Sequence, residues 1–446
     1  MSRFSTDARG RSRSVSFGGP AVEGEIALEI REAKHHFPGT QDKTFLDAAC
    51  VGLAPTESRL AIERFLDQAL MCPDRDASTH HIALDQARAT AVREGARLLE
   101  AGDDEIALVE STTHGLNVVA AAIPFQPHEN VVICDLEFLQ VAIPWLKLAE
   151  RGGIREVRMA RNREGAVPVE AFAEHVDADT RAVVVSSVQW TNGFAVDLHG
   201  LADLCRVHGA LLVVDAIQQL GATRLSVRDT LADVVVAGGH KWLNAPFGCG
   251  LLYVRRSTLP ELRMPSWGYL GLDPPEGGWG RYFATPESTP IRIYDFPTTA
   301  KSLEINGTAN YPGAVGLGAS LELINGLGIT TIEAHVLELT DRLHEQLPRL
   351  GVRVVTRPER EARSGITTFE VSDVPAENEA FLQAMLDERV YVAMRYTSGV
   401  GGIRVSTHLY NDHDDVDRLL QVMGRLLTRR ARAGRPPHRR SSTRPA

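Results

Sequence analysis

Short apolar runs alternate along the chain with longer amphipathic or irregular stretches. Six runs have the length and composition of buried strands: 106–109, 131–134, 182–186, 211–214, 233–237 and 250–254. Strands separated by helical stretches are typical of a mainly parallel sheet that is covered by helices. The last two runs are joined by only about a dozen residues with several turn-forming glycines, so we expect these two strands to be antiparallel.

Other segments complete the predicted organisation. Residues 44–49 read as a strand that runs into a turn at 51–55, and residues 84–100 read as an amphipathic helix. Residues 266–297 are rich in Gly, Pro and aromatic residues without a clear period, which predicts a loop over the site or between subunits. A smaller C-terminal part is predicted from a helix at 314–327, strands near 352–356, 367–371 and 402–406, and a closing helix at 414–427.

These elements predict an α/β protein with two folded domains and two tails. We assign residues 1–25 to a disordered N-terminal tail and residues 26–300 to a large domain whose short N-terminal segment joins the small domain. Residues 301–428 form the smaller α+β domain, and residues 429–446 form a basic disordered tail.

Composition supports an ordinary globular protein, with 446 residues, 43% hydrophobic and 24% charged. No apolar run approaches the roughly 18 residues of a membrane span, and the first residues lack the apolar segment of a secretory signal. We therefore expect a cytoplasmic protein without membrane association. The five cysteines are odd in number and widely spaced, which predicts neither a disulfide framework nor a metal site.

Charge is distributed unevenly along the chain. The net charge of −9 leaves about −19 for residues 20–428 once the +7 of residues 429–446 and the +3 of residues 1–19 are set aside. An acidic body argues against a nucleic-acid enzyme. The C-terminal arginines, prolines and serines could touch a polyanion, but such composition is more typical of a solvated disordered end.

Candidate chemistry lies where two adjacent apolar runs end. Asp215 follows the run at 211–214, and Lys241 follows the run at 233–237. Pyridoxal phosphate needs a lysine amine to form a Schiff base with its aldehyde and an acid to keep its pyridine nitrogen protonated. The pair could fill these roles, although an Asp after a buried strand is common and a Lys beside Gly-Gly-His could belong to a solvated turn.

Other polar residues extend this candidate site. Ser111, Thr112 and Thr113 follow a strand and precede an apolar helix, which suits a phosphate cradle, although Ser111 or Thr112 could simply cap the helix. Arg404 lies in a strand of small residues and is suited to gripping an α-carboxylate, with a surface salt bridge as the alternative.

Three further residues are candidates for contact with the cofactor. Gln218 could reach its phenolic oxygen, with Gln219 as a competitor. His240 could bond the phosphate or orient the lysine amine, or be structural. Phe138 is the candidate for stacking on the ring, with a core role as the alternative.

Several motifs together resemble one known family. The segments LDAACVGL, ESTTHGLN, LLVVDAIQQLG, GGHKW, EINGTANYPGAVGLGASLE and IRVSTHLYND are similar to the class V aminotransferase group of pyridoxal-phosphate enzymes. This group includes cysteine desulfurases, selenocysteine lyases, isopenicillin N epimerase-like proteins and cysteine C–S lyases. The resemblance covers about residues 26–427 and implies a fold-type I transferase with a mainly parallel, seven-stranded-type sheet, a small amino-acid substrate and a homodimer with a shared active site.

The resemblance also implies a role for each matching residue. Lys241 would be the Schiff-base lysine and catalytic base, Asp215 the pyridinium partner, and Gln218 the partner of the phenolic oxygen. Thr112 and Thr113 would lie in the phosphate loop. Thr308 would reach the phosphate of the neighbouring subunit, and Arg404 would hold the substrate carboxylate.

The chain departs from the family pattern at several positions. Residues 396–400 lack the nucleophilic cysteine that desulfurases carry there, and no cysteine follows Cys249, so persulfide chemistry at that loop is not expected. Phe138 replaces a stacking histidine, and Gly238 replaces a serine. The remaining departures concern the substrate side of the pocket, where we place Gln189, Trp190, Asn192 and Cys50.

These features favour a C–S β-lyase that acts on an S-substituted cysteine. Lys241 would remove the Cα proton, and the sulfur would leave as a thiolate. The resemblance extends to proteins that handle S-conjugated cysteines in antibiotic pathways such as lincosamide biosynthesis. The alternatives are decarboxylation with oxidative deamination of the same conjugate, epimerisation or transamination at Cα, and a non-catalytic scaffold that interacts through its basic tail.

Overall fold

The computed structural model describes residues 29–433, so the predicted N-terminal tail lies outside the described residues. Helix α13 (His413–Ala433) runs past the predicted tail boundary, and residues 429–433 are therefore helical, which corrects that part of the assignment. Arg430 in this last stretch bonds the backbone oxygen of Val371, at 3.2 Å, and pairs with Glu377. The rest of the predicted C-terminal tail lies outside the described residues.

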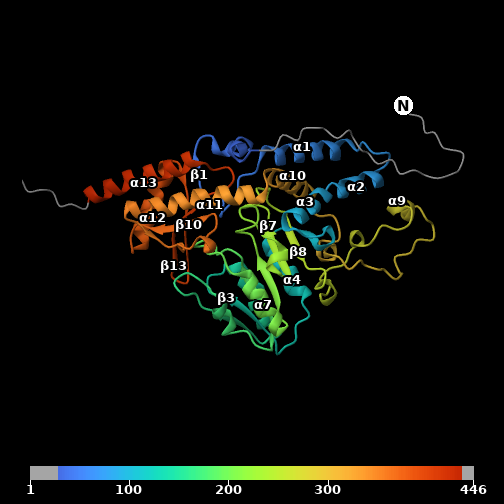
Figure 1. The fold of residues 1–446 in the computed structure, drawn as a ribbon. Coiled ribbons are helices and arrows are strands. Elements are labelled where there is room, and N and C mark those ends of the chain that lie inside the picture. Colours follow the sequence, from blue (N-terminus) through green and yellow to red (C-terminus); the bar gives the residue numbers. More distant parts are fainter. Residues whose placement is uncertain (1–28, 434–446) are drawn as a thin grey trace, which may run out of the picture.

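A seven-stranded sheet forms the centre of the larger part of the molecule (Figure 1). The strand order is β2-β8-β7-β6-β5-β3-β4, with β3 to β7 parallel and β8 antiparallel to both neighbours. This confirms the predicted mainly parallel sheet and its antiparallel pair. The strands are β2 (Ile106–Val109), β3 (Asn130–Cys134), β4 (Glu156–Ala160), β5 (Thr180–Ser186), β6 (Leu211–Asp215), β7 (Val234–Gly238) and β8 (Gly250–Val254).

Both faces of the sheet are buried, because successive strand residues point to opposite sides. In β5, Val183 and Val185 belong to one core cluster, whereas Ala182 and Val184 belong to another. The second cluster includes residues of α4 (Thr112–Ala122) and α5 (Leu139–Glu150). The first cluster includes residues of the helices on the other face: α3 (Ala89–Leu99), α6 (Val169–Ala173), α7 (Leu198–His208), α8 (Val227–Thr230) and α10 (Tyr311–Leu327).

Two predicted elements differ from the structure. Strand β4 was missed because it is an edge strand in which only Ala160 is buried, so it shows no apolar run. The helix predicted over 84–100 is two helices, α2 (Ala77–Gln86) and α3, after α1 (Thr56–Met71). The break lies at Arg88, whose buried guanidinium pairs with Glu304.

The smaller part contains an antiparallel four-stranded sheet with the order β12-β13-β10-β9. Strand β1 (Thr44–Phe45) pairs with β11 (Val390–Tyr391), so the N-terminal segment joins this smaller part. Leu46 packs in its core. The other elements are β9 (Arg353–Val354), β10 (Ile366–Glu370), β12 (Ala393–Thr397), β13 (Val400–Ser406), α11 (Ile329–Gln346), α12 (Pro375–Asp387) and α13.

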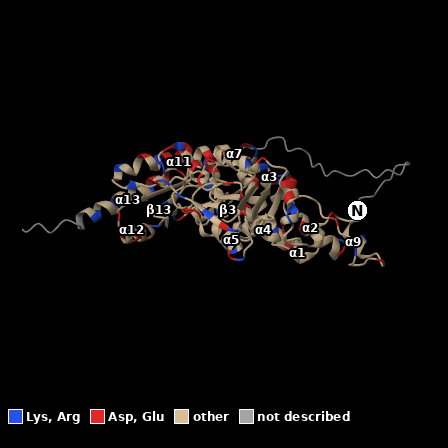
Figure 2. Cartoon of the chain, turned by 90° about the horizontal axis from the view of Figure 1, so that it is seen from below, with Lys and Arg blue, Asp and Glu red and all other residues tan. Residues whose placement is uncertain are grey.

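Residues 266–297 extend away from the body of the molecule, with the short helix α9 (Gly278–Phe283) at the far end (Figure 1). Large apolar side chains are exposed on this arm, among them Trp267, Phe283, Ile291 and Ile293. Elsewhere acidic and basic residues are interspersed over the outer helices (Figure 2). Within residues 29–433, no single helix is long and apolar enough to cross a membrane, and α10 and α11 reach that hydropathy only as a pair bent by 78°.

Candidate active site

One cavity of about 330 Å³ gathers most of the predicted site residues. It opens where β6 ends at Asp215, where Lys241 follows β7 and where α4 begins, at the carboxyl edge of the parallel strands. The lining residues are Ala49, Cys50, Ser111, Thr112, Thr113, Phe138, Gln140, Ser186, Trp190, Asp215, Ile217, Gln218, His240, Lys241, Arg395 and Arg404.

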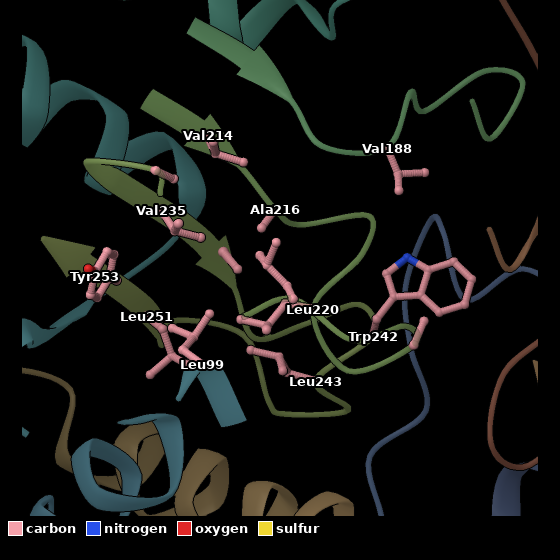
Figure 3. Close-up of a cluster of buried hydrophobic side chains, with 14 of the residues drawn as sticks. Leu99, Val188, Val214, Ala216, Leu220, Val235, Trp242, Leu243, Leu251 and Tyr253 are labelled. Atoms are coloured by element: carbon pink, nitrogen blue, oxygen red, sulfur yellow. The ribbon is translucent and has the colours of Figure 1, made fainter. Parts of the chain in front are cut away.

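The loop that carries Lys241 is held from two sides. The N–H of Gly52 donates to the backbone oxygen of His240 at 2.9 Å, and a Cβ at Gly52 would lie 1.9 Å from the backbone oxygen of Lys241. The following residue, Trp242, is fully buried beside Leu220 and Leu243 (Figure 3). Because both sides are packed tightly, the position of the lysine is set by the fold.

Asp215 is buried, Lys241 is half-buried, and the two charged groups influence each other. Burial lowers the pKa of the Lys241 amine, with the Asp215 carboxylate acting in the opposite direction. Burial raises the pKa of Asp215, opposed by the N–H of Ile217, which donates to Oδ1 at 3.0 Å. A buried carboxylate is stabilised by a cation or donor placed against it, so this environment suits a pyridinium N–H.

The start of α4 supplies the phosphate side. Ser111 caps the helix by accepting the N–H of His114 at 3.1 Å, so the capping alternative holds for this side chain. Thr112 Oγ1 accepts the N–H of Gly238 at 2.8 Å, which ties the helix start to the end of β7. The N–H groups of Thr112 and Thr113 lie in the first turn, where a helix has no backbone acceptors of its own, so they are available to an anion.

Gln218 and His240 line the same cavity as Lys241. Gln218 donates to the oxygen of Ala49 at 3.1 Å and accepts from Nε1 of Trp242 at 2.8 Å, so its amide is already oriented. His240 stacks on Phe247 with ring centroids 5.0 Å apart. Burial, and then the Lys241 charge, lower the pKa of His240, which favours the neutral ring.

Phe138 and Trp190 form an aromatic wall. Their ring centroids lie 5.2 Å apart at an interplanar angle of 75°, and Nζ of Lys241 lies 6.0 Å from the Phe138 ring centroid. Phe138 keeps 40% of its surface exposed, which fits a ring that is free to stack on a ligand better than a core residue.

Arg404 is 1% exposed, so the surface salt bridge considered from the sequence is wrong. Its Nη1 donates to the backbone oxygen of Trp190 at 2.8 Å, and its Nη2 donates to Asp47 at 3.1 Å. The buried Nε has no partner within residues 29–433. The cation is therefore fixed at the wall of the cavity, where a carboxylate can reach it.

Arg395 is a cavity residue that the sequence did not reveal. Its Nη1 bonds the backbone oxygen of the neighbouring Met394, and its Nη2 lies 3.5 Å from Sγ of Cys50. In the described part of the chain no carboxylate lies within ion-pair distance of it. The residues of β12 do not form a clear apolar face, so the sequence gives no sign that this arginine faces the interior.

Three predicted residues do not line the cavity. Gln189 and Asn192 are fully buried, and their amides bond Glu137 and the oxygen of Gly165 instead, so the substrate-binding role predicted for them is corrected to a structural one. The polar character of these two residues does not indicate in the sequence which way their side chains point. Thr308 is exposed and outside this cavity, and its predicted contact with a neighbouring subunit stays a prediction.

The segment that lacks the family's cysteine is a tight hairpin. Thr397 of β12 pairs with Val400 of β13, so only Ser398 and Gly399 form the turn, both with positive φ. Ser398 Oγ donates to the backbone oxygen of Asp135 at 2.7 Å. This short, anchored turn leaves no extended loop to carry a nucleophile into the cavity.

Known proteins show similarity over nearly the whole described chain. The Aminotransferase class-V family matches residues 44–419. A probable cysteine desulfurase of Methanothermobacter thermautotrophicus is 27% identical over 416 residues, which cover 89% of this chain and 98% of the relative. An uncharacterized aminotransferase of Schizosaccharomyces pombe is 30% identical over 326 residues, which cover 72% of this chain and 76% of the relative.

Solved structures share the fold. The apo structure of a cysteine desulfurase from Thermococcus onnurineus NA1 matches with a TM-score of 0.76 at 22% identity, covering 89% of this chain and 98% of that one. A cystine C–S lyase, solved with its reaction product cysteine persulfide, matches with a TM-score of 0.76 at 22% identity, covering 87% and 99%. The chain belongs to the class V aminotransferase family, with the fold type I architecture and the pyridoxal phosphate cofactor that its motifs predicted.

Proposed function

We propose that this protein is a C–S β-lyase that cleaves an S-substituted L-cysteine to a thiol, pyruvate and ammonia. The observation that carries the proposal is the combination of Lys241 and Arg404 in one cavity with a tight Ser398–Gly399 turn in place of a nucleophile loop. A β-elimination needs a base at Cα and a grip on the carboxylate, and it needs no enzyme nucleophile. Relatives named cysteine desulfurase and cystine C–S lyase support cleavage at a carbon–sulfur bond.

Pyridoxal phosphate, when bound, withdraws electrons from the substrate's Cα, so that its proton becomes acidic. Arg404 holds the α-carboxylate through a charge-assisted hydrogen bond and thereby orients the Cα–H bond. Lys241, whose pKa is lowered by burial, has an amine that is readily free to take this proton. The Cβ–S bond then breaks, sulfur leaves with the electron pair as a thiolate, and the remaining three-carbon enamine is hydrolysed to pyruvate and ammonia.

Incubation of the holoprotein with S-methyl-L-cysteine tests this reaction. We expect methanethiol and pyruvate in equal amounts from the wild type and neither from Lys241→Ala. Carbon dioxide with hydrogen peroxide would instead indicate oxidative deamination, and racemised substrate alone would indicate an epimerase; either outcome overturns the lyase proposal. A role in a natural-product pathway stays a prediction.

We also propose that two copies of the chain form the working unit. The exposed aromatic and aliphatic side chains of the 266–297 arm are unusual on a free surface and suit burial against a second copy. Thr308, which follows this arm in the sequence, is exposed, as expected for a residue that contributes to the active site of the other subunit. Light scattering of the purified protein should give twice the mass of one chain, and Ile291→Asp with Ile293→Asp should shift it toward one chain.

A further inference from the structure

A buried carboxyl group lies directly behind the wall of the cavity. Glu137 is only 8% exposed and lies between β3 and α5, immediately before Phe138. Phe138 and Ser186 both line the cavity, and Glu137 is hydrogen-bonded to Ser186. The lyase reaction proposed above gives this acid no task, although a buried acid is rarely found without a partner or a function.

Four donors surround the two oxygens of Glu137. The N–H of Ser186 donates to Oε1 at 2.9 Å, and the hydroxyl group of Ser186 donates to Oε2. Nε2 of Gln189 donates to Oε1 at 3.2 Å, and Sγ of Cys134 lies 3.1 Å from the same oxygen. Burial raises the pKa of the Cys134 thiol, so the sulfur retains its proton and acts as a donor.

These contacts favour the ionised form of Glu137. Burial raises the pKa of this carboxyl group, and the donors of Ser186, Cys134 and Gln189 act in the opposite direction. A backbone N–H and a side-chain amide N–H can only donate, so Oε1 is an acceptor for both. All four donors are neutral, so they stabilise the negative charge without cancelling it.

The sheet connects this charge to the coenzyme site. Ser186 at the end of β5 is paired in register with Asp215 at the end of β6. The N–H of Ser187 donates to the backbone oxygen of Asp215 at 3.0 Å, so the two strand ends are fixed relative to each other. Burial raises the pKa of Asp215, and the charge of Glu137 adds to this effect, whereas the charge of Lys241 opposes it.

We propose that Glu137 is a positioning residue for the coenzyme, because it places a second negative charge behind Asp215. A positive pyridine nitrogen beside Asp215 is stabilised by both carboxylates, and so is the protonated nitrogen that joins the coenzyme to Lys241. The bonds to Ser186 also hold the chain just before Phe138, the ring expected to stack on the coenzyme. This role does not depend on which substrate bond breaks, so it stands apart from the proposed lyase reaction.

Two substitutions separate the charge of Glu137 from its shape. Glu137→Gln retains the length of the side chain and removes its charge, whereas Glu137→Asp retains the charge and shortens the side chain. In the holoprotein, the visible absorption of the coenzyme changes as the nitrogen joined to Lys241 loses its proton with rising pH. We expect the midpoint of this change to fall by about 0.5–1 pH unit in Glu137→Gln and to stay near the wild-type value in Glu137→Asp.

A second measurement needs no bond to the lysine. The phosphate of 4′-deoxypyridoxine lacks the aldehyde, so its affinity for the coenzyme-free protein depends on the ring and the phosphate alone. We expect its dissociation constant to rise about fivefold in Glu137→Gln and less than about twofold in Glu137→Asp. The matched control is Glu150→Gln at the end of α5, where the carboxylate is 64% exposed, and it should resemble the wild type in both measurements.

Ser186→Ala removes one donor and leaves Glu137 in place, so it provides a test that does not require Glu137→Gln to fold. We expect it to lower the midpoint in the same direction by a smaller amount. An unchanged midpoint and affinity in Glu137→Gln would show that the group is neutral, and equal losses in Glu137→Gln and Glu137→Asp would show a purely structural role; either result overturns the proposal. Absence of pyruvate from S-methyl-L-cysteine would count against the lyase and not against Glu137.

Discussion

Asp47 Oδ1 accepts a hydrogen bond of 3.1 Å from Nη2 of Arg404, which joins the N-terminal segment to strand β13 at the wall of the active site. Burial raises the pKa of Asp47, with Arg404 acting in the opposite direction. Asp47→Ala would leave a nearly fully buried guanidinium without its carboxylate. We expect a loss of about 3 kcal/mol in the free energy of unfolding, measured by urea denaturation.

The control for this change is Asp42→Ala. Asp42 pairs with Arg389 on the surface, where both side chains are more than half exposed. Exposed pairs contribute only about 0–1 kcal/mol, so this variant should unfold near the wild-type midpoint. Equal effects of the two substitutions would show that burial of the Arg404 pair is unimportant.

His408 makes stability depend on pH. Its fully buried ring donates from Nε2 to the oxygen of Trp242 at 2.9 Å, and burial lowers its pKa to about 3. The unfolded chain therefore binds a proton on this ring as pH falls below about 6.5, whereas the folded protein does not. Its contribution to stability is full above that pH and declines as pH falls toward about 3.

Unfolding midpoints in urea between pH 7 and pH 4 measure this effect. We expect His408→Phe to show a shallower loss of stability on acidification than the wild type, whatever its stability at pH 7. An exposed-histidine control, His199→Phe, should keep the wild-type slope, because His199 is 65% exposed. An unchanged slope in His408→Phe would contradict the assignment.

Gly52 sets how closely the N-terminal segment approaches the lysine loop. Gly52→Ala would place its Cβ 1.9 Å from the backbone oxygen of Lys241, so one of the two segments must move. We expect a destabilisation of about 1–3 kcal/mol and weaker binding of pyridoxal phosphate, followed by its visible absorption. Gly424→Ala, with its nearest neighbour at 3.9 Å in helix α13, should bind the cofactor like the wild type.

Phe138 is expected to contribute to cofactor affinity by stacking. Phe138→Ala should raise the dissociation constant of pyridoxal phosphate about fivefold, which corresponds to about 1 kcal/mol. Titration of the cofactor-free protein, followed by absorbance, measures the change. Leu139→Ala, which truncates a side chain that is 60% exposed and outside the cavity, is the matched control.

The sequence predicted the fold best where burial is complete on both faces of a strand. Strands β2 and β8 match their apolar runs to the residue, because nothing polar interrupts them. The sequence does not predict β4, because the side chains of this strand are largely exposed. It does not predict the break before α3, because an arginine is expected at the surface, whereas Arg88 is buried.

The sequence predicts those site residues that lie at or just after the ends of apolar strands. Asp215 ends β6 and Lys241 follows the end of the neighbouring strand β7, so the sheet topology brings them to the same edge. Arg395 could not be predicted, because a lone cation in a short strand gives no sign of facing a cavity. The opposite error concerns Gln189 and Asn192, whose amides face inward to bond Glu137 and Gly165, a direction that only the packed structure defines.

The close backbone contact of Gly52 with His240 and Lys241 has a consequence for how the protein folds. Segments that lie far apart in the chain must dock before the lysine loop reaches its final shape, and such long-range contacts form late. We therefore expect the chain to capture the coenzyme only after these segments have docked, so the yellow colour of the bound form should report a fully folded molecule.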